Sequence, residues 1–131
     1  MPTIEKSASY RECGVLQMAS DVKKYQVWYA NLGEGEGSEQ KGYRPVVIIQ
    51  NDIGNAHSPT TIVAICTTKL TKAKLPTHFW LSLYCGLPEH TLVMCEQIRT
   101  IDKSRLVKYI GEIQEQEKKY IDACLAVSLA L

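Results

Sequence analysis

The chain reads Gly37-Ser38-Glu39-Gln40-Lys41-Gly42-Tyr43-Arg44-Pro45 and runs straight into Val46-Val47-Ile48-Ile49-Gln50-Asn51-Asp52. A polar, glycine-bearing loop thus ends in an arginine. The apolar run that follows is typical of a strand covered on both faces. Because Arg44 precedes a proline, its backbone is restricted to extended conformations. We therefore expect a permanent cation at the rim of a sheet, where it can bind a phosphate bidentately. The alternative is a surface arginine paired with Glu39 or Asp52.

The rest of the chain contains several short strand-like segments and one helical pattern. We predict strands over 25–30, 44–50, 60–68, 77–83 and 91–100, and either a strand or a turn over 104–110. Glycines make 31–42 a flexible loop, and 51–59 is composed of turn residues. From Gln114 to Leu131 apolar residues recur at spacings of three and four, which indicates an amphipathic helix that packs on the core or on another subunit. The prediction is a mainly β (α+β) fold, a small curled sheet or barrel of antiparallel strands with a C-terminal helix.

The length of 131 residues favours one domain. Residues 1–22 are polar and lack periodicity, so we predict an N-terminal arm there, either a short helix or a loosely held segment, and a single domain over 23–131. There is no signal-peptide pattern and no apolar run of about 18 residues, so we expect a cytoplasmic protein without a membrane segment. Five cysteines at irregular spacing predict reduced thiols, with no metal site and no cofactor.

The net charge of +1 hides an uneven distribution. Between residues 66 and 110, seven lysines and arginines face three acidic residues, whereas the segment 111–122 has four acidic residues against two lysines. A basic middle is compatible with a face that binds phosphates.

Polar residues at strand ends and within one strand are the other candidates for chemistry. Thr67 and Thr68 end the third predicted strand, where a hydroxyl can donate to a phosphate oxygen, although threonine is also common in strands. Glu96 and Gln97 interrupt an apolar strand, so they must face solvent, find partners or line a site. Asn51 stands where a strand ends and a turn begins. RNA needs no metal for cleavage, because its 2′-hydroxyl is a built-in nucleophile that requires only positioning and charge stabilisation.

These residues belong to a series of motifs that resembles the MazF/PemK family of bacterial toxins over residues 25–131. The motifs are Gly37-Ser38-Glu39-Gln40, Arg44-Pro45-Val46-Val47-Ile48-Ile49-Gln50-Asn51-Asp52, Ser58-Pro59-Thr60, Ile62-Val63-Ala64, Lys72-Ala73-Lys74-Leu75-Pro76-Thr77-His78 and Glu96-Gln97-Ile98-Arg99-Thr100-Ile101-Asp102. The resemblance implies an SH3-like barrel that works as a homodimer. It also implies a toxin that cleaves single-stranded RNA at a short sequence without a metal ion, leaving a 2′,3′-cyclic phosphate and a 5′-hydroxyl.

The resemblance also assigns roles to residues. It places the catalytic arginine at Arg44 and the catalytic threonine at Thr67. It implies that Ser38, Glu39 and Gln40 close over the RNA, and that Glu96 and Gln97 help to read its bases, with Asn51 and Thr68 as further RNA contacts. The implied protein partner is a cognate antitoxin whose partly disordered segment folds onto the dimer and blocks the RNA groove.

The chain departs from the family pattern at three places. These are the N-terminal arm, the acidic segment Gly33-Glu34-Gly35-Glu36, which replaces an apolar or proline-containing stretch, and Ala56-His57, where larger or basic residues are common. Two other functions stay open from sequence. One is a CcdB-like barrel toxin that acts on DNA gyrase without catalysis, and the other is a barrel that binds RNA without cutting it.

Overall fold

The computed structural model describes residues 21–69 and 74–131, and six strands in this part of the chain form one antiparallel sheet. The elements, with η marking 3-10 helices, are β1 (Gln26–Asn31), β2 (Tyr43–Ile48), α1 (Asp52–His57), β3 (Thr60–Thr67), β4 (His78–Leu81), η2 (Leu83–Cys85), β5 (Thr91–Asp102), η3 (Lys103–Arg105), β6 (Leu106–Glu112) and α2 (Glu115–Leu129).

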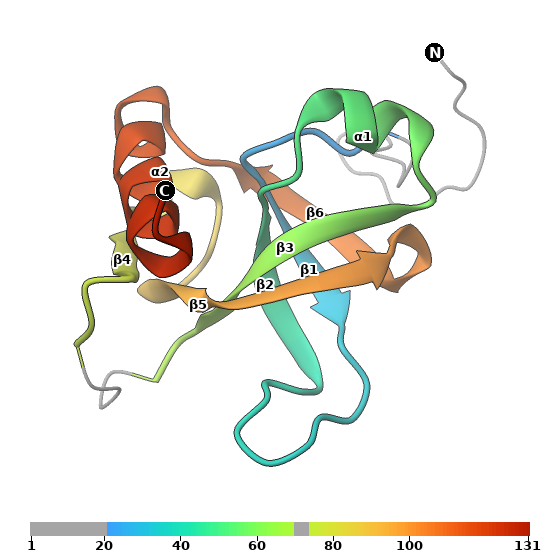
Figure 1. Cartoon of the computed structure of the whole chain (residues 1–131), viewed down its shortest axis with the longest axis horizontal. Helices are drawn as coiled ribbons and strands as arrows, with labels where there is room; N and C mark the ends of the chain where they lie inside the picture. The colour runs from blue at the N-terminus through green and yellow to red at the C-terminus, as the bar shows by residue number, and fades with distance from the viewer. Residues whose placement is uncertain (1–20, 70–73) are drawn as a thin grey trace.

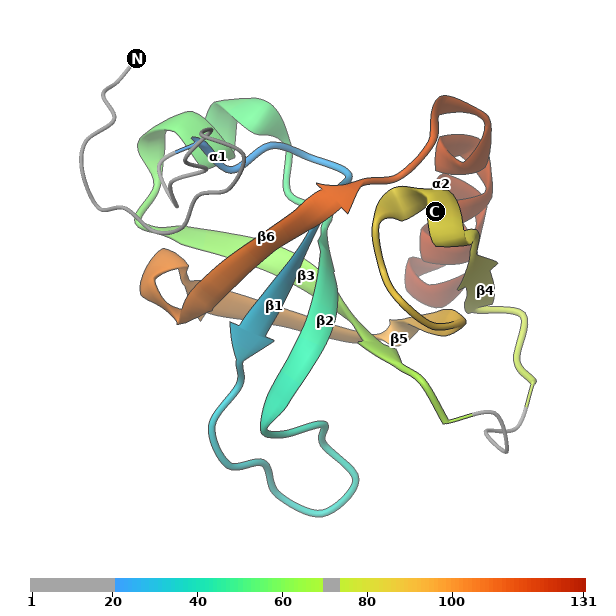
Figure 2. The same ribbon diagram turned by 180° about the vertical axis from the view of Figure 1, so that it is seen from behind.

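The strands lie in the order β4-β5-β3-β2-β1-β6. The sheet twists and curls, with α2 packed against β4 and β5 (Figures 1 and 2). The short helix α1 contacts β3 and lies on the far side of the sheet from α2 (Figure 1). The loop between β1 and β2 projects away from both helices (Figure 1). Because β4 and β6 stand at the two ends of the order, the sheet is a half-barrel in the described residues. The predicted mainly β fold with a C-terminal helix is confirmed.

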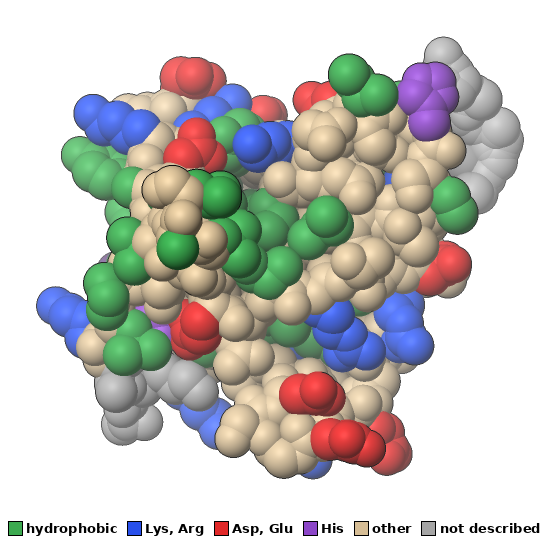
Figure 3. Space-filling view, viewed as in Figure 1, with side chains coloured by type: hydrophobic (Ala, Val, Ile, Leu, Met, Phe, Trp, Pro, Cys, Tyr) green, Lys and Arg blue, Asp and Glu red, His purple; other side chains and the backbone are tan. Residues whose placement is uncertain are grey.

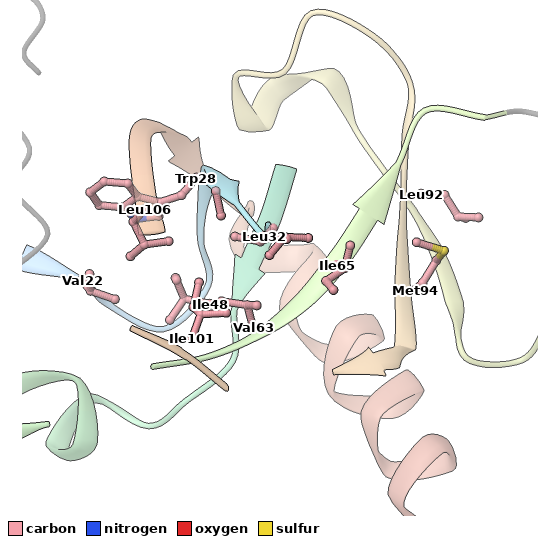
Figure 4. Packing of buried hydrophobic residues seen from close by; sticks show 12 residues of the cluster. Val22, Trp28, Leu32, Ile48, Val63, Ile65, Leu92, Met94, Ile101 and Leu106 are labelled. Carbon is pink, nitrogen blue, oxygen red and sulfur yellow. The ribbon is translucent and has the colours of Figure 1, made fainter. Parts of the chain in front are cut away.

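Both faces of the sheet are packed, as the apolar run in β2 predicted. Val46 and Ile48 belong to one cluster of buried side chains, which includes Trp28 and Met94 (Figure 4). Val47 points the other way and belongs to a second cluster, which contains side chains of η2 and α2. Alternate residues of a strand point to opposite faces, so a strand between two cores needs apolar residues throughout.

Residues 1–20 of the predicted arm over 1–22 lie outside the described part of the chain. The next residues are described, and Val22 is a buried member of the first cluster.

Two local predictions need correction, and one open alternative is resolved. The turn predicted over 51–59 contains the helix α1, because the Asn51 side chain accepts a hydrogen bond from the Gly54 backbone N–H at 2.8 Å and so caps its first turn. The strand predicted over 77–83 ends at Leu81, because the Ser82 hydroxyl caps η2. Of the two alternatives expected over 104–110, the strand is the one that forms; it runs from Leu106 to Glu112 and follows η3.

A close contact between two backbones fixes the segment that follows η2. A Cβ placed on Gly111 of β6 would lie 2.0 Å from the carbonyl oxygen of Cys85, and one on Gly86 would lie 2.7 Å from the carbonyl oxygen of Ile110. Gly86 also has a φ of +106°, a conformation that favours glycine. The two glycines therefore let η2 pack directly on β6, which positions the following residues Leu87–Glu89.

Candidate active site

Arg44 and Thr67 lie at the ends of two neighbouring strands that share a pocket. β2 and β3 are antiparallel, with Val46 opposite Ile65, so Arg44, two residues before Val46, and Thr67, two residues after Ile65, lie at the same end of the pair. Both line a pocket of about 190 Å³, called here the Arg44 pocket. Its lining residues are Tyr29, Tyr43, Arg44, Pro45, Thr67, Thr68, Leu87, Pro88, Glu89 and Thr91.

The Arg44 side chain is partly buried and anchored to the preceding loop. Its Nε donates a hydrogen bond to the carbonyl oxygen of Lys41 at 3.0 Å. Within residues 21–69 and 74–131 the guanidinium forms no ion pair, and Glu39 and Asp52 instead accept bonds from the backbone N–H groups of Glu36 and Lys24. The alternative of a surface arginine paired with Glu39 or Asp52 is therefore wrong. No described residue forms a hydrogen bond with the terminal nitrogens, which can therefore meet an anion in the pocket.

Thr67 is buried, with a side chain that faces this same pocket. Its hydroxyl oxygen accepts a hydrogen bond from the backbone N–H of Lys69 at 3.2 Å. Because that bond uses an acceptor lone pair, the hydroxyl proton is free to be donated. A cation and a hydroxyl donor that line one pocket are groups able to bind a phosphate.

Gln97 lies in a second pocket, of about 330 Å³, called here the Gln97 pocket. Its lining residues are Glu39, Gln40, Ile65, Gln97, Ile98 and Arg99. The β3–β5 pairing jumps from Ala64–Ile98 to Ile65–Met94, so Cys95, Glu96 and Gln97 have no partners on β3. An irregularity of this kind bends the strand and redirects its side chains. The loop residues Glu39 and Gln40 and the strand residue Gln97, all predicted RNA contacts, therefore line the same pocket.

Glu96 is held by two neighbouring side chains, that of Thr77 just before β4 and that of His78, the first residue of β4. The Thr77 hydroxyl donates to Glu96 Oε1 at 2.7 Å, and His78 Nε2 lies 2.9 Å from Glu96 Oε2. Burial disfavours the charged carboxylate, but these two hydrogen bonds outweigh it, so the pKa of Glu96 lies below its ordinary value of 4.5. Since the carboxylate is ionised at neutral pH, His78 Nε2 carries the hydrogen of this bond.

The remaining predicted RNA contacts are dispersed. Thr68 lines the Arg44 pocket, and Ser38 is exposed on the β1–β2 loop. Acidic side chains gather over this loop in the space-filling view (Figure 3), in agreement with its Glu34, Glu36 and Glu39. Asn51 caps α1 and follows β2 after Ile49 and Gln50, so it lies beyond the end of β2 opposite Arg44, and it lines neither pocket.

Sequence reasoning missed a large part of the Arg44 pocket. Tyr43 sits next to Arg44, and its aromatic side chain was the one available signal. Tyr29, Thr91 and the wall Leu87–Glu89 come from distant parts of the chain, and nothing in their sequence context points to the site.

Three further observations concern the cysteines, possible metal ligands and helices of the described residues. The four cysteines in the described residues, Cys66, Cys85, Cys95 and Cys124, are free and buried, as predicted, and Cys13 lies outside those residues. No group of three or more His, Cys, Asp or Glu side chains in that part of the chain is placed to hold a metal ion. None of the described helices has the length and apolar character needed to cross a membrane.

Comparison with known proteins shows the family of the chain. Residues 23–129 match the family described as PemK-like, MazF-like toxin of type II toxin-antitoxin system. The chain belongs to this toxin family. A curated relative, Endoribonuclease EndoA of Bacillus subtilis (strain 168), is 47% identical over 111 residues, which cover 84% of this chain and 96% of the relative.

Solved structures of MazF-type proteins share the fold. An endoribonuclease in complex with its cognate antitoxin, from a mycobacterial species, has a TM-score of 0.70 and 26% identity, and the match covers 84% of this chain and 96% of that one. MazF from Deinococcus radiodurans has a TM-score of 0.72 at 18% identity, over 84% of this chain and 97% of that chain. The curled sheet with a C-terminal helix is therefore the MazF fold.

Proposed function

We propose that this protein is the toxin of a type II toxin–antitoxin pair, an endoribonuclease that cuts single-stranded RNA, including mRNA, at a short specific sequence in the cytoplasm. Membership of the PemK-like, MazF-like family and the 47% identical endoribonuclease support the class of activity. The observation that carries the mechanism is the placement of Arg44 and Thr67 in one pocket.

The chemistry we propose uses the RNA's own 2′-hydroxyl. Its oxygen attacks the adjacent phosphorus, the bond to the 5′-oxygen of the next nucleotide breaks, and the proton passes from the 2′-hydroxyl to the leaving oxygen. The products are a 2′,3′-cyclic phosphate and a 5′-hydroxyl, and the proposed reaction uses no metal ion. The Arg44 guanidinium binds the scissile phosphate and assists proton transfer, while the Thr67 hydroxyl hydrogen-bonds the phosphate oxygens as their charge grows.

Base recognition is assigned to the surfaces around the Gln97 pocket. Gln97 offers both a donor and an acceptor, and Glu96 offers a fixed acceptor that suits an amino group of a base. The loop carrying Ser38, Glu39 and Gln40 closes over the bound RNA, and Thr68 and Asn51 make further contacts with it. Single-stranded bases expose the edges that such side chains read.

A second copy of the chain is proposed to dock on a groove beside the Gln97 pocket, called here the α2 groove. The groove holds about 490 Å³ and is lined by Lys24, Ile49, Ile62, Ile98, Asp122, Leu125, Ala126, Leu129 and Leu131. A hydrophobic patch lies next to the C-terminal end of α2 in Figure 3, and Leu129 and Leu131 are 53% and 90% exposed. Apolar residues exposed together favour a protein interface. Ile98 lines both the groove and the Gln97 pocket, so a docked copy would border the RNA-reading surface.

The protein partner we propose is a cognate antitoxin, a partly disordered peptide that occupies the RNA groove. Support comes from the solved complex of a structurally similar mycobacterial endoribonuclease with its antitoxin. A segment that folds upon binding can cover a long groove and thereby exclude the RNA.

The test is incubation of purified wild-type protein with a long single-stranded RNA in EDTA, followed by mapping of new 5′ ends. Cuts at one short sequence are expected. An intact RNA at high protein concentration, with the fold verified by circular dichroism, would contradict the nuclease. Inhibition of DNA gyrase without RNA cleavage would favour the CcdB-like alternative, and RNA binding without cleavage would favour a binding barrel.

A further inference from the structure

Two tyrosines form a stacked pair on the wall of the Arg44 pocket. The rings of Tyr29 and Tyr43 have centroids 5.3 Å apart and planes inclined by 9°. β1 and β2 pair with Tyr29 opposite Pro45, so Tyr43, two residues earlier in β2, is its diagonal neighbour on the same face. Tyr29 belongs to the partly buried side chains that pack on the second cluster, which anchors the pair to the core.

Tyr43 presents an uncovered aromatic face to the solvent. The residue is 55% exposed, although one face of its ring rests on Tyr29. The exposed area is therefore the outer face and edge of a ring that is supported from behind. An exposed tyrosine packed on another ring loses little conformational freedom when a flat ligand stacks on it.

The position of this ring relative to Arg44 suits a nucleotide. Successive residues of a strand point to opposite faces, yet Tyr43 and Arg44 both line the pocket because it lies at the end of β2. A ligand with a phosphate at one end and a planar ring at the other can therefore contact both residues at once.

We propose that Tyr43, supported by Tyr29, is a stacking platform for an RNA base next to the phosphate that Arg44 binds. This inference rests on the proposed function, because it takes RNA as the ligand of the Arg44 pocket. Aromatic stacking tolerates every base, so Tyr43 supplies affinity and fixes the nucleotide, while sequence is read elsewhere. The Tyr43 ring also offers RNA an aromatic contact next to the β1–β2 loop, whose segment Gly33–Glu36 is acidic and has no apolar side chain.

The experiment compares Tyr43→Leu and Tyr43→Phe with the wild type. The probe is a pool of short, random-sequence, single-stranded RNA that is fully 2′-O-methylated, so that it cannot be cut, and labelled with fluorescein for anisotropy. Tyr43→Leu is expected to raise the Kd about 5- to 150-fold, the range found for loss of one stacked base, and Tyr43→Phe to stay close to the wild type. The matched control is Tyr120→Leu, since Tyr120 is 50% exposed and stacks on Phe79 at 5.5 Å outside the pocket.

Salt dependence separates stacking from charge. The slope of log Kd against log salt concentration is expected to be unchanged in Tyr43→Leu and reduced in Arg44→Ala, because only the arginine displaces counterions from the phosphate. An unchanged Kd in Tyr43→Leu, or an equal loss in Tyr43→Phe and Tyr43→Leu, would overturn the platform. Because the pool cannot be cut, this result is independent of the cleavage assay, so failure of the platform and failure of the nuclease are distinguishable.

Discussion

Arg44, the second residue of β2, and Thr67, the last residue of β3, lie at the same end of two paired strands and line one pocket. Rigid strands hold both side chains, so a phosphate bound there meets a cation and a hydroxyl donor in fixed positions. Such preorganised groups stabilise developing charge more effectively than mobile ones do.

Removal of either group should slow RNA cleavage without unfolding the protein. We expect Arg44→Ala and Thr67→Val to reduce kcat by at least about 100-fold, the typical loss of one preorganised donor. Valine has nearly the shape of threonine, so the second variant removes only the hydroxyl. Thermal unfolding within a few degrees of the wild type serves as the control, and a Thr67→Val enzyme with wild-type kcat would remove Thr67 from the mechanism.

The approach of η2 to β6 should tolerate no side chain at Gly111. In Gly111→Ala the new Cβ would lie 2.0 Å from the Cys85 carbonyl oxygen, so the backbones must separate. We expect the free energy of unfolding to fall by about 2 kcal/mol or more in urea titrations. Gly37→Ala is the comparison, because its Cβ would meet nothing within 4 Å and only its φ of +58° is unfavourable. Equal losses in the two variants would mean that the close contact does not matter.

Tyr25 should stabilise the fold in a pH-dependent way. Its hydroxyl donates to the two carboxylate oxygens of Asp122 on α2 at 2.8 and 2.9 Å. Burial and this hydrogen bond raise the pKa of Tyr25 from 10.0 to about 12. Because the folded state holds the proton more tightly, the stabilisation is complete below pH 10 and is lost as the pH rises toward 12.

We therefore expect Tyr25→Phe to lower the free energy of unfolding by about 1 kcal/mol at pH 7. The difference from the wild type should shrink as denaturant titrations are repeated above pH 10. A difference that stays constant across that range would show that the hydroxyl contributes nothing through its proton.

The opposite pH dependence is expected for Glu96. Its pKa is lowered in the folded state, so the stabilisation is present above the ordinary value of 4.5 and is lost as the pH falls through the folded value. Thr77→Val removes one hydrogen bond to the carboxylate and should raise the pKa of Glu96 in an NMR titration of its carboxyl carbon. Thr68→Val, which removes an exposed hydroxyl that does not contact Glu96, is the control. An unchanged pKa in Thr77→Val would contradict the role of Thr77.

Asn51 should contribute to stability through the cap of α1. Asn51→Ala leaves the Gly54 backbone N–H without its partner, and we expect a loss of about 1 kcal/mol, whereas Asn51→Asp keeps the cap. Equal stability of Asn51→Ala and the wild type would contradict the capping role. The predicted RNA contact is a separate matter, which RNA binding by Asn51→Ala tests directly: an unchanged Kd would exclude it.

The sequence predicted those features that depend on local pattern. The β2 strand followed from its continuous apolar run, and the helix α2 followed from its periodicity. The helix α1 was missed because it is short and its stability comes from side-chain bonds, namely the Asn51 cap and the bond from Gln50 Nε2 to Asn55 Oδ1.

The parts of the site that depend on long-range packing could not be predicted from pattern. The wall Leu87–Glu89 reaches Arg44 because Gly86 and Gly111 allow two backbones to touch. Glu96 was recognised as an unusual polar residue in a strand, but its bonds to Thr77 and His78 depend on the register of β4 against β5.

The central claim is that the Arg44 pocket promotes attack by the 2′-hydroxyl on the neighbouring phosphate. The most direct measurement uses two oligonucleotides that contain the mapped cleavage sequence, one all ribose and one with a single 2′-deoxy sugar before the scissile phosphate, each incubated with wild-type protein in EDTA. We predict that only the all-ribose strand is cut, and that its products carry a 2′,3′-cyclic phosphate and a 5′-hydroxyl by mass spectrometry. Cleavage of the 2′-deoxy strand, or a 5′-phosphate on the product, would contradict the mechanism.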